Sequence, residues 1–231
     1  MSAITRLPTP EFTADEIRAR ILWENDHLLI WDKPSGLPVH KGFGGGVTLD
    51  DYLPYLQADG ARLPALIHRL DRETSGCLAL GRSDDALRTY NRFFEQQRVQ
   101  KTYLALVFGS LKPEGIISLP IRQFRVGAGM RSEIDETRGQ VAETHYRTLH
   151  KTRGMSLIEA QPKTGRMHQL RVHFAALGCP IAGDRLYGGQ DAGFNQLMLH
   201  AAKLQLPSSK LAPALVQESP TPAEWLPYLS Q

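Results

Sequence analysis

The sequence predicts an α+β fold with a mixed, mainly antiparallel sheet flanked by helices and loops. Segments with strand character outnumber segments with helical periodicity, and several neighbouring strand segments are joined by turns too short for a helical crossover. The chain has 231 residues, of which 42% are hydrophobic and 22% charged, as in an ordinary globular protein with a sizeable core. We therefore expect one main domain over residues 21–231, preceded by a variable extension over residues 1–20.

The expected strands are short apolar or β-branched runs bounded by turn residues. The first two flank an Asn25-Asp26 turn, and the Pro34-Ser35-Gly36 sequence turns the chain after them. In chain order the expected strands are 21–24, 27–31, 66–68, 76–80, 101–109, 141–149, 156–160 and 197–206. The interval 111–139, rich in glycine and arginine, does not fit one class of element, so a lid, an insertion and irregular strands all stay open.

Helices are indicated by capping residues followed by apolar residues at helical spacing. Ser83 is an N-cap candidate, and the helix after it carries Leu87, Tyr90 and Phe94 on one apolar face. A later helix is expected to end at Gly178, which suits the left-handed position after a helix. The expected helices are 14–20, 49–56 with Thr48 as its cap, the helix after Ser83, 166–177, and a terminal turn at 223–229.

Composition and charge limit the classes of protein to which the chain can belong. No run approaches the ~20 apolar residues of a membrane-spanning helix, and the N-terminal residues lack the apolar stretch of a secretory signal. The two cysteines, Cys77 and Cys179, stand in apolar surroundings, so free thiols in a reducing cytoplasm are favoured over a disulfide between them. The net charge of +3 permits an acidic partner such as nucleic acid without requiring one.

Three common kinds of site are poorly supported. The glycine-rich stretch at 42–46 does not have the spacing of a nucleotide-binding loop, so a flexible loop is the better interpretation. His168 and His173 are five residues apart and would face different ways on a helix, and no cysteine or glutamate motif accompanies them as metal ligands. A serine hydrolase is disfavoured because G-x-S-x-G is missing. A nucleotide-phosphate site and a zinc site are therefore both disfavoured by these residues.

Asp71 is the residue whose position most needs explaining. It lies in the segment IHRLDRETSG (67–76), between two apolar runs, where an unpaired charge costs several kcal/mol. Thr74-Ser75-Gly76 already supplies turn-forming residues, so Asp71 is not needed for that purpose. Either the segment is a polar loop between strands, or the acid is held there for chemistry. A partly buried acid needs an arginine partner to remain ionised, and such a carboxylate can act as a nucleophile.

The segment 162–178, PKTGRMHQLRVHFAALG, contains several candidate binding residues. Leu170, Phe174 and Leu177 are expected to form its core-facing stripe, with His168 and Arg171 on a neighbouring polar face. Lys163 and Arg166 would precede or begin the helix, where backbone N–H groups favour an anion. A solvated surface helix and a phosphate-binding helix start, with Arg171 pointing into a site, are both compatible with these residues.

HRLDRETSG resembles the H-R-L-D-x-x-T-S-G signature of the RluA-type family of RNA pseudouridine synthases. Further segments agree with the family in the same order. They are DKPSGLPVH (32–40), KTYLALVFG (101–109), GRMHQLRVHFAALGCPIAGDRLYG (165–188) and LMLHAAKL (197–204). The resemblance spans about residues 21–206, so it implies that the main domain is a pseudouridine synthase catalytic domain. It leaves no room for the N-terminal S4-type RNA-binding domain of many relatives.

The resemblance implies that the protein isomerises uridine in RNA to pseudouridine without metal or cofactor. Asp71 matches the essential catalytic aspartate, and Arg171 matches the arginine that pairs with it. Tyr103 matches the tyrosine that stacks on the target base and is a candidate for assisting proton removal. Arg69 matches a residue that helps to displace the target uridine from its stack. Leu170 falls where the family packs an apolar side chain near the base.

A uridine in folded RNA must leave the base stack before its reacting atoms become accessible, and an aromatic ring can then stack on it. Candidate phosphate contacts are Lys33, Lys163, Arg166, Arg88 and Arg92, each of which is equally compatible with a solvated surface charge. His168 is a further candidate substrate-binding residue.

We expect RNA, either rRNA or tRNA or both, as the partner of a cytoplasmic monomer that needs no protein partner and no membrane. Two alternatives remain. One is an RNA-binding protein on the same fold that has lost catalysis, and the other is a base-removing hydrolase with Glu73 as a second acid. The presence of Asp71, Tyr103 and Arg171 together disfavours the first. The second is unsupported because Glu73 follows Asp71 by only two residues in an expected turn.

Overall fold

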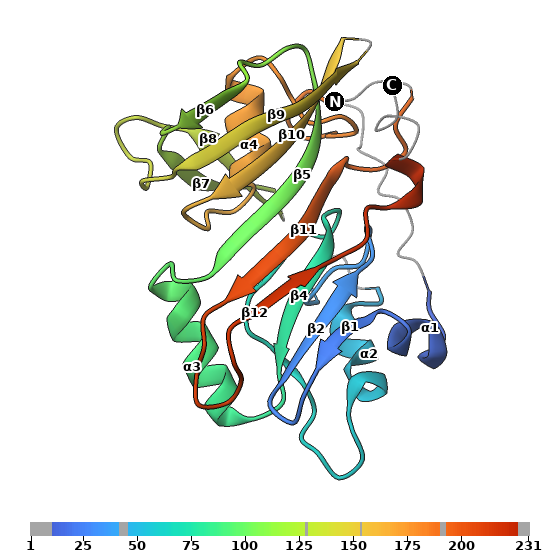
Figure 1. The fold of residues 1–231 in the computed structure, drawn as a ribbon. Coiled ribbons are helices and arrows are strands. Elements are labelled where there is room, and N and C mark those ends of the chain that lie inside the picture. The colour runs from blue at the N-terminus through green and yellow to red at the C-terminus, as the bar shows by residue number, and fades with distance from the viewer. Residues whose placement is uncertain (1–10, 42–45, 128, 153, 190–192, 226–231) are drawn as a thin grey trace. The chain divides into compact units, whose positions relative to one another are not determined.

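A computed structural model describes residues 11–41, 46–127, 129–152, 154–189 and 193–225 (Figure 1). The chain divides into two compact units. The first contains residues 1–100 and 201–220, and the second contains residues 101–200 and 221–231. No helix among the described residues is long and apolar enough to cross a membrane.

The first unit is built on a sheet with the strand order β1-β2-β4-β11. The pairs β1–β2, β2–β4, β3–β4 and β11–β12 are antiparallel. The strands are β1 (Ile21–Glu24), β2 (Leu28–Lys33), β3 (Ala65–Leu66), β4 (Ser75–Gly81), β11 (Leu199–Leu206) and β12 (Leu215–Glu218). Every residue of β4 is buried, which explains the uninterrupted apolar run that follows Ser75. Strand β11 begins in the second unit and continues in the first.

Helical elements complete the first unit. Thr13 caps α1 (Ala14–Arg18) in a capping box with Glu16, and Trp31 donates from Nε1 to the Ile17 carbonyl (2.8 Å). The short helix α2 (Leu49–Tyr52) continues into the 3₁₀ turn η1 (Leu53–Leu56). Ser83 caps α3 (Asp84–Glu95), whose fully buried residues are Ala86, Tyr90 and Phe93. Leu87 and Phe94, expected on the apolar face, are only partly buried at its margin.

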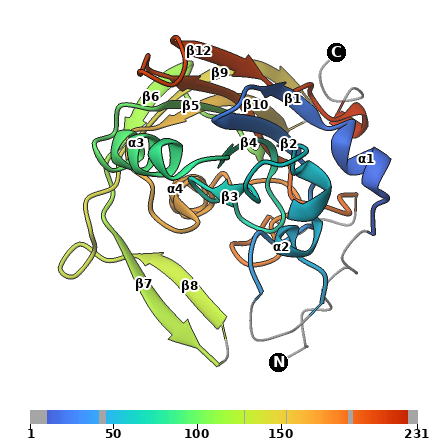
Figure 2. The ribbon, with the colours of Figure 1, turned by 90° about the horizontal axis from the view of Figure 1, so that it is seen from below.

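The second unit contains an antiparallel sheet with the order β5-β10-β9-β6 and a separate two-stranded sheet, β7–β8. The bounds are β5 (Gln100–Phe108), β6 (Glu114–Ile117), β7 (Ile121–Val126), β8 (Gly129–Ile134), β9 (Thr144–Thr152) and β10 (Met155–Pro162). Figure 2 shows the β7–β8 hairpin extending away from β5, β9 and β10. The interval 111–139, left open by the sequence, therefore contains three strands.

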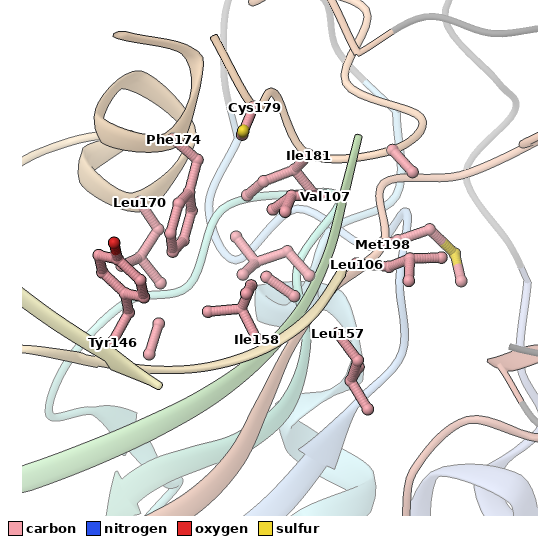
Figure 3. Packing of buried hydrophobic residues seen from close by; sticks show 14 of the residues in the cluster. Leu106, Val107, Tyr146, Leu157, Ile158, Leu170, Phe174, Cys179, Ile181 and Met198 are labelled. Carbon is pink, nitrogen blue, oxygen red and sulfur yellow. The ribbon is translucent and has the colours of Figure 1, made fainter. Parts of the chain in front are cut away.

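Helix α4 (Gln169–Ala176) packs on this sheet, and η2 (Ala223–Trp225) follows near the C-terminal end. In Figure 3 the side chains of Leu170 and Phe174 point from α4 into an apolar cluster that also contains Tyr146 and Ile158. All six residues from Gln169 to Phe174 are buried, so α4 is enclosed on every side. Leu177 was expected in the core stripe, but 41% of its surface is exposed and that prediction is wrong.

The predicted α+β class is confirmed, and most expected elements occur within a few residues of their predicted bounds. Helix α4 begins at Gln169 and not at 166, because His168 adopts a left-handed conformation (φ 56°). Strand β9 lies three residues later than the expected 141–149. Strand β12 was not predicted. Gly178 takes the expected left-handed conformation (φ 72°) after α4. Most of the glycine-rich loop at 42–46 and part of the terminal turn at 223–229 lie outside the described residues.

Candidate active site

Asp71 lies in a turn between β3 and β4, where it is partly buried. The Thr74 N–H donates to the Asp71 carbonyl (3.1 Å) and closes the turn. A second turn, at residues 34–37, is hydrogen-bonded alongside it. The Gly36 N–H donates to the Arg72 carbonyl (2.9 Å), Arg72 Nε donates back to the Gly36 carbonyl (2.9 Å), and Ser35 Oγ donates to the Glu73 carbonyl (2.8 Å). The backbone that carries the acid is thus fixed by a segment distant in sequence.

Lys33 is fully buried at the junction of these two turns. Its Nζ donates to the carbonyls of Pro34 (2.9 Å), Leu37 (2.8 Å) and Arg72 (2.9 Å), which satisfies all three ammonium donors. Burial lowers the pKa of Lys33 to about 7, although the carboxylates of Asp71 and Asp32 oppose this shift. The structure therefore contradicts the prediction that Lys33 contacts phosphate, because its donors are already occupied beneath the surface.

The segment directly before Asp71 contains both buried apolar residues and an exposed arginine. Ile67 and Leu70 are buried, and the N–H of Ala79 in β4 donates to His68 Nε2 (2.9 Å), which also fixes the segment before Asp71. Arg69 is exposed. Gly76, at the end of the turn, has φ +107°, and a Cβ atom there would lie 2.3 Å from the Ala201 carbonyl oxygen. Only glycine fits that position, which agrees with the predicted turn.

Tyr103 lies on β5 in the second unit, opposite Ala160 of β10, and its side chain is partly buried. Lys101 is two residues earlier and thus on the same face of the strand. Its Nζ donates to the Thr164 carbonyl (3.3 Å), and burial lowers its pKa to about 8. Sequence reasoning overlooked Lys101, although its two-residue spacing from Tyr103 was a usable signal.

The entry to α4 is fixed by the side chain of Gln169. Its Oε1 accepts hydrogen bonds from Thr164 Oγ1 (2.7 Å) and the Arg166 N–H (3.0 Å). Its Nε2 donates to the Glu143 carbonyl (2.9 Å) and Thr144 Oγ1 (3.0 Å). All four partners of this buried amide are thus protein groups, so the start of the helix and the residues just after it are held firmly.

His173, one turn further along α4, extends the same network. Its Nε2 contacts the Leu119 carbonyl (2.9 Å) and its Nδ1 contacts Thr144 Oγ1 (2.9 Å). Burial lowers the pKa of His173, while the Leu119 carbonyl opposes the shift. A neutral ring that donates from Nε2 and accepts at Nδ1 satisfies both contacts, so His173 has a structural role and is not a metal ligand here.

Arg171 forms a buried, bidentate ion pair with Asp184. Nε donates to Oδ2 and Nη2 donates to Oδ1, both at 2.8 Å, and the two side chains are 4% and 0% exposed. Asp184 Oδ1 also accepts the N–H groups of Leu186 (2.9 Å) and Tyr187 (3.2 Å). Sequence reasoning missed Asp184, which the GDRLYG motif (183–188) carries. The alternative of a solvated surface helix is wrong, because Arg171 is buried.

The remaining predicted binding residues of the second unit differ in exposure. Leu170 is 5% exposed and belongs to the apolar core. Lys163 is exposed, and Arg166 donates from Nε to the Val141 carbonyl (3.0 Å). Both precede α4, which is one of the two placements that the sequence allowed. His168 directly precedes α4, and its Nδ1 lies 2.8 Å from Tyr187 Oη.

Comparison with known proteins identifies the family. The profile of the RNA pseudouridylate synthase family matches residues 27–176, more than half of the chain. The chain belongs to this family. The resemblance to RluA-type pseudouridine synthases is thereby confirmed, and with it the class of enzyme, an isomerase that converts uridine in RNA to pseudouridine.

Several curated relatives are pseudouridine synthases. An uncharacterized RNA pseudouridine synthase of Zymomonas mobilis is 40% identical over 88% of this chain and 94% of the relative. The ribosomal large subunit pseudouridine synthase D of Nitrosomonas europaea is 35% identical over 90% of this chain and 64% of the relative. The corresponding synthase C of Vibrio cholerae is 39% identical over 82% of this chain. The chain spans 62% of that relative, so these two ribosomal synthases are substantially longer than the matched part.

Solved structures agree with the family assignment. Human RNA Pseudouridylate Synthase Domain Containing 4 superposes with a TM-score of 0.78 at 29% identity, over 92% of each chain. Human RNA Pseudouridylate Synthase Domain Containing 1 gives a TM-score of 0.77 at 29% identity, over 96% of this chain and 89% of the other. The α+β fold of this pseudouridine synthase is therefore the fold of its structurally characterised relatives.

Proposed function

We propose that this pseudouridine synthase isomerises one or more uridines of ribosomal RNA, with Asp71 as the acid that acts on the target nucleotide. The relatives from Nitrosomonas europaea and Vibrio cholerae are named as ribosomal large subunit enzymes, which favours rRNA over tRNA as the first substrate to test. The observation that carries the assignment of Asp71 is its position. A partly exposed acid lies beside a fully buried strand, on a turn that is hydrogen-bonded to a second segment.

The reaction requires that the target uridine leave the base stack, because C1′, C5 and C6 are otherwise inaccessible. Arg69 is exposed beside Asp71 and suits the role of occupying the vacated space. The ring of Tyr103 stacks on the extruded base. Asp71 then acts by attack at C1′ or C6, or by removing a sugar proton. The N1–C1′ bond breaks, the uracil rotates and C5 joins C1′; N1 gains a proton and C5 loses one, so the formula is unchanged.

Arg171 is proposed to keep Asp71 ionised. Asp184 engages Nε and Nη2 of the Arg171 guanidinium, which carries five N–H donors and can serve more than one carboxylate. The proposed pairing with Asp71 is therefore compatible with the ion pair to Asp184. Asp184 then has the role of orienting the guanidinium, because a bidentate pair fixes both its position and its plane.

RNA contacts outside the reacting nucleotide are proposed for exposed or partly exposed basic residues before α4 and on α3. Lys163 and Arg166 precede α4, and Arg88 and Arg92 lie on α3. His168 and Leu170 remain candidates close to the base. The β7–β8 hairpin, which carries three arginines and one glutamate, is the proposed determinant of target choice. Phosphate contacts of this kind supply affinity and position without reading sequence.

The decisive experiment incubates the full chain with unmodified ribosomal RNA and tRNA transcripts and maps pseudouridine by carbodiimide-dependent reverse-transcription stops. New stops in rRNA support the proposal, and stops confined to tRNA redirect the substrate assignment. No new stops in either RNA would refute the proposed activity, and release of free uracil would instead indicate the hydrolase.

Asp71→Asn is expected to abolish product formation while RNA binding persists. Asp59→Asn, an exposed loop substitution of the same chemistry, serves as the matched control and should retain full activity. Loss of RNA binding by a folded Asp71→Asn variant would show that Asp71 is not primarily catalytic. Tyr103→Phe should retain more activity than Tyr103→Ala if stacking dominates, and the reverse order would indicate a proton role for the hydroxyl.

A further inference from the structure

The side chain of Tyr187 contacts β7, β8, α4 and the residue directly before α4. It belongs to the segment after Asp184, its ring packs against the small cluster that contains Ile121 and Val172, and its hydroxyl is hydrogen-bonded to two further segments. Ile121 lies on β7 and Val172 on α4. A single side chain thus joins the base of the β7–β8 hairpin to the helix that carries Arg171.

Tyr187 contacts Arg171 directly through its ring and indirectly through its backbone N–H, which binds the same carboxylate. The guanidinium carbon lies 5.1 Å from the centroid of the Tyr187 ring, a cation–π distance. The Tyr187 N–H donates to Asp184 Oδ1 (3.2 Å), the same oxygen that accepts Arg171 Nη2 (2.8 Å). The carboxylate therefore fixes one edge of the guanidinium and the aromatic ring covers one face. A displacement of Tyr187 would change both contacts together.

The hydroxyl of Tyr187 holds the ring in place. It accepts the N–H of Ser132 in β8 (3.0 Å) and lies 2.8 Å from His168 Nδ1. Ser132 Oγ donates to the Met167 carbonyl (2.7 Å), so β8 is attached both to the tyrosine and to the residues directly before α4. His168 keeps a left-handed conformation, which costs roughly 1–2 kcal/mol and needs surrounding contacts to persist.

We infer that Tyr187 is a positioning residue for Arg171 and that it couples the β7–β8 hairpin to the guanidinium. This inference rests on the proposed roles of Arg171 in catalysis and of the hairpin in RNA binding. Within the hairpin, Arg122 pairs with Glu133 (3.5 Å) and with Asp135 (3.4 Å) just after it, and Arg125 and Arg131 add further positive charge suited to RNA phosphates. When an RNA phosphate binds Arg131, it displaces the adjacent Ser132 N–H and with it the Tyr187 hydroxyl. The movement of Tyr187 then alters two contacts of the Arg171 guanidinium, the one with the tyrosine ring and the one with Asp184.

Tyr187→Phe tests the positioning role, because it removes the hydroxyl and keeps the ring. The single-turnover rate should fall about tenfold, equivalent to about 1.4 kcal/mol of activation free energy, while the dissociation constant for RNA stays within about twofold. Tyr90→Phe is the matched control. Tyr90 is a buried tyrosine on α3 whose hydroxyl contacts Ser209 Oγ (3.2 Å), and its loss should leave the rate unchanged. An unchanged rate in Tyr187→Phe, or an equal loss in both variants, overturns the inference.

A double-mutant cycle tests the coupling. Arg131→Ala should lower the single-turnover rate in the wild-type background and have little further effect in Tyr187→Phe, because the connection is already broken. Additive effects, or no effect of Arg131→Ala on the wild type, would overturn the coupling.

A readout without RNA separates this inference from the proposed activity. The ¹⁵N Nε–H resonance of Arg171, assigned by its absence in Arg171→Met, should shift in Tyr187→Phe and not in Tyr90→Phe. If the wild type forms no pseudouridine but the resonance shifts as expected, the proposed function fails and the positioning of Arg171 by Tyr187 stands. If the wild type is active and neither the rate nor the resonance responds to Tyr187→Phe, the inference fails and the proposed function stands.

Discussion

Asp184→Asn should severely destabilise the protein, because it removes the carboxylate that forms the buried, bidentate ion pair with the Arg171 guanidinium. The two side chains are 4% and 0% exposed, so water cannot replace the lost partner. If Oδ1 of the asparagine keeps the two backbone N–H groups, its amide NH₂ faces the Arg171 Nε–H, and two donors oppose each other. Removal of one partner from a buried pair costs about 3–5 kcal/mol. For a chain of this size that lowers the melting temperature by roughly 6–20 °C.

Thermal and urea unfolding followed by circular dichroism measures this effect. Glu159→Gln is the control in the same unit, since it breaks the Arg147–Glu159 pair, whose side chains are 60% and 27% exposed. That variant should lie within about 1 kcal/mol of the wild type. If Asp184→Asn is equally mild, the buried pair is not a stabilising feature and the reasoning is refuted. Arg171→Lys should lose less stability than Asp184→Asn. The lysine ammonium still supplies a positive charge to Asp184, although it cannot form the bidentate pair that the guanidinium forms.

Three further predictions concern the first unit. Because burial lowers the pKa of Lys33 to about 7, below its unfolded value near 10.5, the unfolded chain binds more protons between these pH values. The wild type should therefore gain stability relative to Lys33→Met as the pH rises from 7 to 10 in urea titrations, and a constant difference would contradict the burial argument. Gly76→Ala should cost far more stability than Gly60→Ala, because its Cβ would meet the Ala201 carbonyl oxygen at 2.3 Å, whereas Gly60 faces open space; similar melting temperatures would argue against the tight turn. Burial raises the pKa of Cys77 to about 12, so a thiol reagent at pH 8 should label it only after unfolding, and rapid labelling of the native protein would disprove its burial.

The α+β class, the positions of most elements and the turn at Asp71 could be predicted because each depends on local chemistry. Ser83 as a helix cap and Gly178 after α4 act within a few residues of the chain. The hairpin at 121–134 could not be placed, since its arginines and glycines give no clear alternation. Strand β12 was missed because only pairing with β11 makes it a strand.

The nine-residue segment around Asp71 was sufficient, with its ordered companions, to indicate the family, because a family signature is contained in the order of residues. Which charges are buried and which partners they have is decided by contacts between distant residues. Lys33 was predicted to bind phosphate, yet its ammonium meets the Arg72 carbonyl 39 residues away. For Arg171 the sequence suggested Asp71 as a partner, which stays a prediction, whereas the structure shows Asp184 as a buried partner. The sequence by itself determined which acidic, basic and aromatic side chains the protein has. The tertiary structure decided which of these side chains are buried and paired and which remain available to RNA, because desolvation and hydrogen-bond pairing exist only once the chain has folded.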